Sequence, residues 1–181
     1  MKNDSFLKVV SAISIAILGL SLAAQVSFNV PIGSGIPITG QSFAILLIGY
    51  FLDWRLSFVS VFIYLILGAI GVPIFAEGKS GVDVITGLSG GYLVGFLPAV
   101  VLVSKWEHAK RNDLLHTFLT FLFVTGIILI IGVIRLSLDL GFPRAIAIGL
   151  KPFWLGAIVK VLLAIIVIYL YLNYSDKDEQ S

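Results

Sequence analysis

Among the residues that could do chemistry, Lys160 stands out because it is the lone charged residue in the otherwise apolar stretch from Pro152 to Tyr174. If this stretch spans a membrane, an unpaired cation in it costs roughly 3 kcal/mol or more. About 13 Å of helix separates Lys160 from Lys151, so its side chain reaches the membrane surface with difficulty. We therefore expect Lys160 to bind a polar ligand inside the protein. The alternative is an internal partner such as Asp139.

Arg135, the other cation within an apolar segment, favours a structural role. It lies about one turn from the outer end of its predicted helix, where a long side chain can extend to the surface. Asp139 follows four residues later and lies on the same helical face. The spacing predicts an internal ion pair between Arg135 and Asp139.

The sequence does not indicate catalysis or metal binding. His108 and His116 lie near Asp113, where ordinary polar loop residues are expected, and their spacing is not that of metal ligands. Residues 73–80 resemble a phosphate-binding P-loop, but Pro73 stands where that motif needs a glycine, and no strand precedes it. We therefore expect no enzyme, no ATP hydrolysis by this chain and no cofactor.

Aromatic and polar residues near the outer ends of the predicted helices could instead form a small-molecule site. The aromatic residues are Phe75, Tyr92, Phe96, Phe153 and Trp154. They form either an interfacial belt or an apolar ligand wall. Gln41, Lys79, Ser89 and Lys160 would complete such a wall with donors and acceptors. Gly90 and Gly91 would allow close backbone approach and expose N–H groups at a helix start.

Composition identifies the kind of molecule that must position these residues. Of its 181 residues, 59% are hydrophobic and 12% are charged, and the mean hydropathy is +1.07. Soluble domains are about 45–50% apolar and about 25% charged, so the chain is predicted to be an integral membrane protein. A net charge of +2 is too small to indicate nucleic-acid binding. The absence of cysteine excludes disulfides and thiolate metal sites.

Hydrophobic runs between polar or Gly/Pro breaks predict an all-α membrane protein with six transmembrane helices. Three runs are long enough to cross a bilayer, which takes ~20 residues. The second, third and fourth are shorter and suit segments surrounded by protein. We expect one domain, residues 1–174, followed by a disordered cytoplasmic tail, residues 175–181. The predicted helices are Lys8–Phe28, Gln41–Asp53, Leu56–Gly71, Gly91–Trp106, Leu114–Leu138 and Pro152–Tyr174.

Lysine and arginine are enriched on one side of this predicted bundle. With the N-terminus inside, seven of the twelve lie in inner connections and three in outer ones. The positive-inside rule then places both termini in the cytoplasm. Two glycine-containing outer connections, Asn29–Gly40 and Val72–Gly90, would lie on the same side and could close over one pocket as lids.

Ala12 and Ala16 lie four residues apart in the first predicted helix and share a face. Small residues with this spacing let another helix approach closely in a membrane. The approaching helix could belong to a partner protein or to the same bundle.

Four motifs resemble the BioY family, the biotin-binding S components of energy-coupling factor (ECF) transporters. They are residues 36–43 (IPITGQSF), 68–81 (GAIGVPIFAEGKSG), 87–96 (GLSGGYLVGF) and 152–160 (PFWLGAIVK). They follow one another in the family's order, and the resemblance covers nearly the whole chain. It implies a six-helix S-component-like bundle with an outward-facing cavity, in the plasma membrane of a prokaryote.

The resemblance also implies a ligand, a set of contacts and partners. The expected ligand is biotin, and the expected partners are a transmembrane coupling subunit, docked on Ala12 and Ala16, and two ATP-binding subunits. The expected contacts are Gln41, Phe75, Lys79, Ser89, Gly90, Gly91, Tyr92, Phe153 and Lys160.

Three positions depart from the family pattern. Leu88 replaces a proline, Lys79 replaces an asparagine found in some members, and Ala157 replaces an aspartate that contacts the ligand in many members. Two alternatives therefore stay open. The same architecture could bind another anionic vitamin or cofactor such as lipoate, or the chain could be a membrane assembly subunit without cargo.

Overall fold

The computed structural model describes residues 2–28, 36–108 and 113–178, and these are largely helical. The long helices are α1 (Lys2–Gln25), α2 (Gln41–Phe51), α3 (Trp54–Ala69), α5 (Gly90–Glu107), α6 (Leu114–Leu140) and α8 (Phe153–Asp178). The short elements are β1 (Ser27–Phe28), β2 (Ile38–Thr39), the 3-10 helix η1 (Ala76–Gly78), α4 (Val82–Thr86) and α7 (Phe142–Gly149).

The six long helices coincide with the six predicted from the hydrophobic runs. Among the described residues, three segments are long and apolar enough to cross a membrane: Phe6–Gln25, Leu114–Leu140 and Phe153–Ser175. The all-α membrane fold is thus confirmed, whereas six complete crossings remain a prediction, because α2 and α3 are shorter. Helix α8 continues to Asp178, past the boundary predicted at Tyr174, and residues 179–181 of the predicted tail lie outside the described residues.

Side-chain caps set the start of two helices. The Asp53 carboxylate accepts hydrogen bonds from the backbone N–H groups of Arg55 and Leu56, and so begins α3. Asp113 caps α6 in the same way. Such caps satisfy N–H groups that have no partner within the helix. The connection between α2 and α3 is consequently short, and α3 begins at Trp54, three residues after α2 ends at Phe51.

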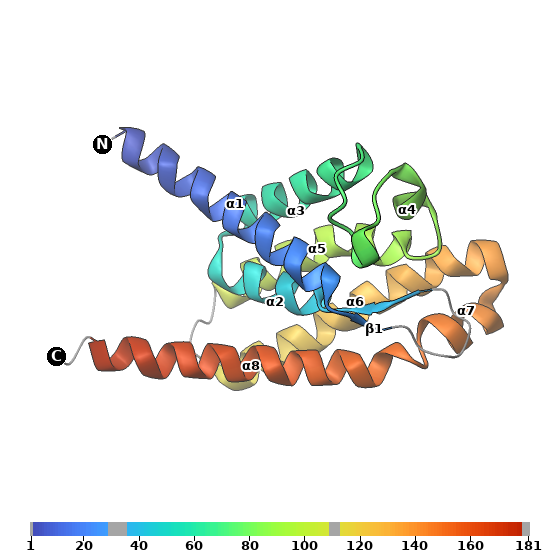
Figure 1. Cartoon of the computed structure of the whole chain (residues 1–181). Helices are drawn as coiled ribbons and strands as arrows, with labels where there is room; N and C mark the ends of the chain where they lie inside the picture. The colour runs from blue at the N-terminus through green and yellow to red at the C-terminus, as the bar shows by residue number, and fades with distance from the viewer. Residues whose placement is uncertain (1, 29–35, 109–112, 179–181) are drawn as a thin grey trace.

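Figure 1 shows the two ends of the bundle. Both termini and the α2–α3 connection lie at the left, and α4 and α7 lie at the right. Helix α5 lies in the middle and packs on α2, α3 and α6. The Val72–Gly90 connection, expected as a long lid, contains η1 and α4 and covers the right-hand end of α3 and α5.

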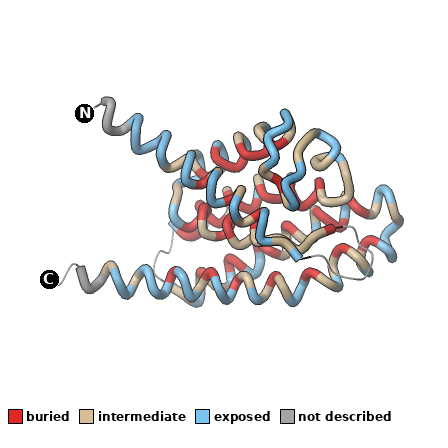
Figure 2. Tube along the Cα trace, in the orientation of Figure 1, coloured by how far each residue is buried: buried red, intermediate tan, exposed pale blue. Residues whose placement is uncertain are grey.

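The outer surface of the bundle is apolar, as the composition requires. Only 11% of the most apolar window of α1 and 22% of that of α8 are buried, against 44% for α6. In Figure 2 exposed positions run along most of α1 and α8, while buried positions gather in the middle of the bundle. Exposed side chains such as Ile15, Leu18 and Leu163 on these helices are suited to contact with lipid or with another membrane protein.

Candidate functional site

One cavity lies between β2, the lid segment (residues 72–90) and helices α2, α5, α6 and α8, and it is partly open to solvent. Seven of the nine predicted contact residues line it: Gln41, Phe75, Lys79, Ser89, Tyr92, Phe153 and Lys160. Segments far apart in the sequence thus converge on one site, as the sequence predicts.

Lys160 reaches from α8 across to the start of α2. Its Nζ donates to the Thr39 carbonyl oxygen at 3.0 Å and to the Ser42 hydroxyl at 2.7 Å. Neither partner carries a charge, and within the described residues no carboxylate forms a salt bridge with Lys160. Asp139, the internal partner considered as an alternative, instead pairs with Arg135. The cavity wall therefore holds a cation whose protein partners are neutral.

Gln41 is buried, and its amide is bonded at both ends. Its Nε2 donates to the Tyr64 hydroxyl at 2.8 Å, and its Oε1 accepts from the Thr39 hydroxyl at 2.9 Å. Tyr64 in turn donates to the Ile74 carbonyl at 2.9 Å. This chain of bonds fixes β2 and the lid segment to α3, so Gln41 organises one wall of the cavity.

Phe75 anchors the lid over α3. Its ring lies edge-on to Tyr64 with centroids 5.5 Å apart. A Cβ at Gly68 would lie 2.1 Å from the Phe75 ring, so only glycine fits beneath it. Lys79 follows Phe75 in the same segment, and its ammonium lies 2.6 Å from a Glu77 carboxylate oxygen. The lysine side chain is 55% exposed. Lys79 is therefore the solvent-facing cation of the cavity.

Tyr92 and Phe153 form the aromatic part of the wall. Their rings stack with centroids 5.5 Å apart, and the Tyr92 hydroxyl donates to the Gly149 carbonyl at 2.8 Å. A Cβ at Gly132 would lie 2.2 Å from the Tyr92 ring, so this glycine makes room for it. The polar end of Tyr92 is engaged, and its ring presents apolar surface to the cavity.

Gly90 and Gly91 do not line the cavity. A Cβ at Gly90 would clash with the Ile85 carbonyl, and one at Gly91 would lie 2.5 Å from the Arg135 Cβ. The structure thus gives these glycines a packing role between α4, α5 and α6. Their predicted ligand contacts remain untested.

Arg135 has the structural role that its spacing predicts. Its guanidinium donates to Asp139 at 2.8 Å and also to the Thr86 carbonyl oxygen of α4. The second bond ties the lid to α6, which the sequence did not indicate.

Sequence reasoning missed three polar residues of the cavity wall, namely Thr39, Ser42 and Thr125. Thr39 and Ser42 flank Gln41 in a short polar run at the start of the apolar helix α2. That run indicates polar residues that a binding site could use. Thr125 lies in the middle of an apolar helix, where nothing in its spacing distinguishes it from a structural threonine. Ala157 also lines the cavity, so the position of the missing aspartate belongs to the site.

A second hollow, an apolar groove between α1 and α2, contains the predicted docking residues. It is lined by Ala12, Ile15, Ala16, Gly19, Ala23, Phe43, Ala44, Leu47, Ile48, Phe51 and Leu52. Ala16 is 5% exposed and belongs to the core, whereas Ala12 is half-buried. The small residues of α1 therefore face this groove and the bundle, while larger side chains such as Leu18 cover the outer face of α1.

Fold and site together define a helical membrane protein built around a small-molecule cavity. The sequence profile of the BioY family matches residues 1–176, and the chain belongs to that family. A probable biotin transporter BioY from Pyrococcus horikoshii is 36% identical over 160 residues, which cover 88% of this chain and 93% of the relative. The biotin transporter BioY of Thermotoga maritima is 32% identical over 144 residues, 78% and 84% of the two chains.

A solved structure shares the fold. The crystal structure of the S-component for biotin from an ECF-type ABC transporter matches with a TM-score of 0.83 and 22% identity, covering 96% of this chain and 95% of that one. This confirms the S-component-like bundle predicted from the sequence. Members of the BioY family are substrate-binding components of transporters rather than enzymes, in agreement with the sequence prediction.

Proposed function

We propose that this protein is the biotin-binding S component of an ECF-type vitamin uptake transporter. The observation that carries the proposal is the cavity, because it brings together seven residues predicted as contacts from four separate motifs. Relatives that align with most of the chain are named biotin transporters, which supports biotin as the ligand.

The chemistry of the cavity suits a molecule such as biotin, which has a fused ring system, a polar ureido group and a carboxylate. The stacked Tyr92 and Phe153 rings offer apolar surface to the ring system. Lys160 offers a half-buried donor for a polar group, and Lys79 offers an exposed cation for a carboxylate that stays near water. Keeping the ligand's charge near solvent avoids the large cost of burying it.

Titration calorimetry of the purified protein with biotin tests the proposal. We expect saturable binding with one site per chain, in the absence of ATP and of added metal. No heat with biotin, together with tight binding of another vitamin, would contradict the assignment of the ligand and leave the fold assignment intact.

One observation favours a second candidate, another anionic vitamin or cofactor such as lipoate. Ala157 lines the cavity at the position where many family members carry a ligand-contacting aspartate, so an acceptor for a ureido N–H group is missing there. Native mass spectrometry of the protein purified without added vitamin distinguishes the two candidates by the mass of the molecule retained. A mass matching lipoate would favour the second.

The groove between α1 and α2 is the proposed docking surface for the transmembrane coupling subunit, which would carry two ATP-binding subunits. Ala12 and Gly19 leave space along the groove, and a Cβ at Gly19 would meet no atom within 4 Å. Such surfaces allow close helix packing in lipid. Helices α1 and α2 thus offer an apolar groove against which a partner helix can pack.

We also propose that both termini lie in the cytoplasm and that the cavity opens to the outside of the plasma membrane. Both termini lie at the same end of the bundle (Figure 1), away from the lid elements. Arg55 and Lys105, which lie over the ring of Trp54 at 5.3 and 5.1 Å, belong to the connections predicted to be inside. Accessibility of single cysteines at Lys105 and Lys79 to a membrane-impermeant thiol reagent in whole cells would test the orientation, with only the second expected to react.

A further inference from the structure

Thr125 is a polar side chain of the cavity wall whose hydroxyl is not hydrogen-bonded to any described residue. Thr125 lies in the middle of α6, lines the cavity and is 5% exposed. Its Oγ1 is buried and has no hydrogen-bond partner among the residues that the structure describes. The neighbouring polar groups differ in this respect, since Gln41, Tyr92 and Lys160 are all bonded to other parts of the chain.

A buried hydroxyl without a partner destabilises the protein that carries it, because water has been removed and nothing replaces it. A threonine in a helix commonly avoids this by bonding to a carbonyl one turn earlier. Among the described residues, Thr125 makes no such bond. Threonine populates two side-chain rotamers in helices, so a rotation about one bond can bring its hydroxyl to the position that its methyl group occupies when a ligand presents a polar group.

The surroundings of Thr125 indicate which kind of ligand group it suits. The cavity-lining residues of α5 and α6 are Tyr92, Leu93, Phe96, Thr125, Ile128 and Leu129. This wall carries no cation, so a carboxylate against it would be buried without a counter-charge, which is strongly unfavourable. An uncharged polar group needs only a hydrogen bond.

Resting on the proposed biotin-binding function, we infer that the Thr125 hydroxyl is a specificity-determining contact for an uncharged polar group of the ligand, namely the ureido group of biotin. In the bound state it supplies the hydrogen bond that the apolar α5–α6 wall otherwise lacks. A ligand without a polar group at this place leaves Thr125 unpaired and binds less well.

Thr125→Val tests this inference because valine has nearly the shape of threonine without the hydroxyl. We expect biotin affinity to fall about tenfold, which corresponds to about 1.4 kcal/mol. The melting temperature of the ligand-free variant should stay the same or rise, because a buried unpaired hydroxyl has been removed. Thr125→Ser, which keeps the hydroxyl, should bind within about threefold of the parent. Thr125→Ala compared with Thr125→Ser isolates the hydroxyl if the valine variant does not fold.

Biotin methyl ester identifies the ligand group involved. The loss caused by Thr125→Val should persist with the ester, since the contact is not to the carboxylate. Unchanged biotin affinity in Thr125→Val, equal losses in the serine and alanine variants, or a loss that disappears with the ester would each overturn the inference. Absence of biotin binding by the parent protein would contradict the proposed function itself, and is thereby distinguished from failure of the Thr125 assignment.

Discussion

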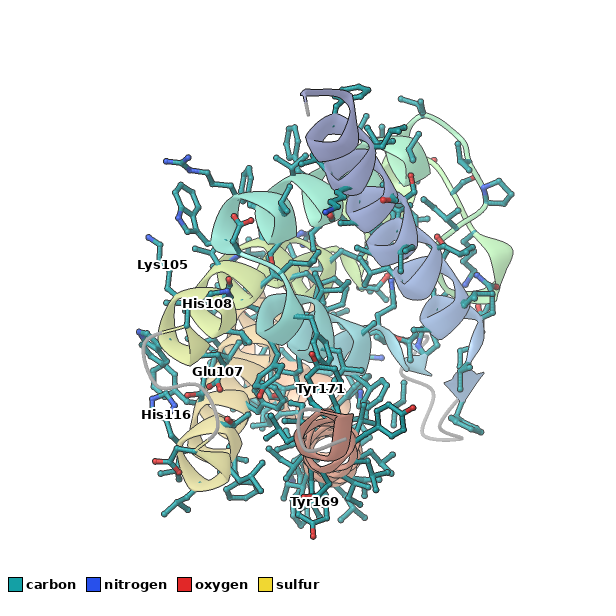
Figure 3. The ribbon with its side chains drawn as sticks, turned by 90° about the vertical axis from the view of Figure 1, so that its left-hand side faces the viewer. Lys105, Glu107, His108, His116, Tyr169 and Tyr171 are labelled. Atoms are coloured by element: carbon teal, nitrogen blue, oxygen red, sulfur yellow. The ribbon has the colours of Figure 1, made fainter. Side chains whose placement is uncertain are left out.

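Two ionisable side chains inside this bundle, the half-buried Lys160 and the buried Glu107, differ in what surrounds them. Glu107 is 1% exposed, accepts a hydrogen bond from the Thr117 hydroxyl at 2.6 Å, and has His116 Nδ1 3.5 Å from its other carboxylate oxygen. Figure 3 shows Glu107 and His116 together at the end that carries the two termini. Lys160 lines the cavity and bonds to neutral groups of Thr39 and Ser42.

This difference separates a structural group from a ligand-binding one. Glu107 joins the end of α5 to the start of α6 and lines neither the cavity nor the groove. An ammonium group has three N–H donors, and Thr39 and Ser42 occupy two of those of Lys160. No described residue accepts from the third donor, which we therefore assign to a molecule in the cavity. Removing Lys160 should therefore impair binding, and removing the Glu107 carboxylate should impair stability.

The largest effect is expected for Lys160→Met, which keeps the apolar stem and removes the charge. A polar ligand group left unpaired in the cavity should lower biotin affinity by about 2–4 kcal/mol, or roughly 30- to 1,000-fold. The melting temperature should stay constant or rise, because the half-buried charge has no anionic partner among the described residues. Calorimetry and thermal unfolding of the same preparation measure both quantities.

Lys160→Arg serves as the matched control for charge. Arginine keeps the positive charge but replaces a compact ammonium by a planar fork of donors, so binding should weaken as well. Unchanged affinity in Lys160→Met would remove Lys160 from the site. A lower melting temperature in the same variant would make Lys160 a structural residue like Glu107.

The second prediction separates ligand binding from transport by changing the groove between α1 and α2. The double variant Ala12→Leu and Gly19→Leu fills the groove without touching the buried Ala16. Uptake of labelled biotin by cells that express the complete transporter should be lost, because a partner helix can no longer approach closely. Biotin affinity of the purified protein should be unchanged.

Leu18→Phe is the control on α1, since Leu18 is 59% exposed and lies outside the groove. Its uptake should equal that of the parent. Loss of biotin affinity in the groove variant would show that α1 packs there within the bundle and that the docking assignment is wrong.

The third prediction concerns Glu107→Gln, which keeps the side-chain shape and removes the charge. The Thr117 hydroxyl then loses a charge-assisted bond, and the free energy of unfolding should fall by about 1–2 kcal/mol. The folded protein should bind biotin as tightly as the parent. Chemical denaturation followed by calorimetry measures stability and affinity. A weakened affinity with unchanged stability would show that Glu107 contributes to ligand binding rather than to stability.

Much of this arrangement could be predicted from the sequence, because it depends on long apolar runs and on short motifs. The six long helices follow from the runs, and the Arg135–Asp139 pair follows from its spacing. Lys160 could be placed in a site because a charge in an apolar helix has few acceptable surroundings.

The remainder depends on contacts between distant segments, which no local pattern encodes. The Lys160 partners lie about 120 residues earlier in the chain, Thr39 and Ser42, and nothing near Lys160 indicates them. Gly91 is required by the close packing of α5 on α6, a role that no local pattern indicates, and its predicted ligand contact stays a prediction. The short helices α4 and α7 were missed because their few residues carry no clear periodicity.

The smallest effect is expected at Gln25, the last residue of α1, which holds the lid closed from outside the cavity. Its Nε2 donates to the Phe75 carbonyl and its Oε1 accepts from the Gly78 N–H, both at 3.1 Å. Gln25→Ala removes both bonds, whereas the bond from Gly81 N–H to the Gly68 carbonyl still holds the lid. Two partly exposed neutral bonds contribute about 1 kcal/mol together, so biotin should dissociate about fivefold faster.

Ser21→Ala is the matched control for Gln25→Ala, because the Ser21 hydroxyl bonds only within α1 among the described contacts, to the Ile17 carbonyl. Its dissociation rate should equal that of the parent, measured by chase of labelled biotin with an excess of unlabelled biotin. Gln25→Glu adds a sharper test, since it keeps an acceptor for Gly78 but sets a carboxylate oxygen against the Phe75 carbonyl, and should also accelerate release. Equal rates in all three variants would mean that the lid is held by its contacts with α3, α5 and α6, without a contribution from the bonds of α1.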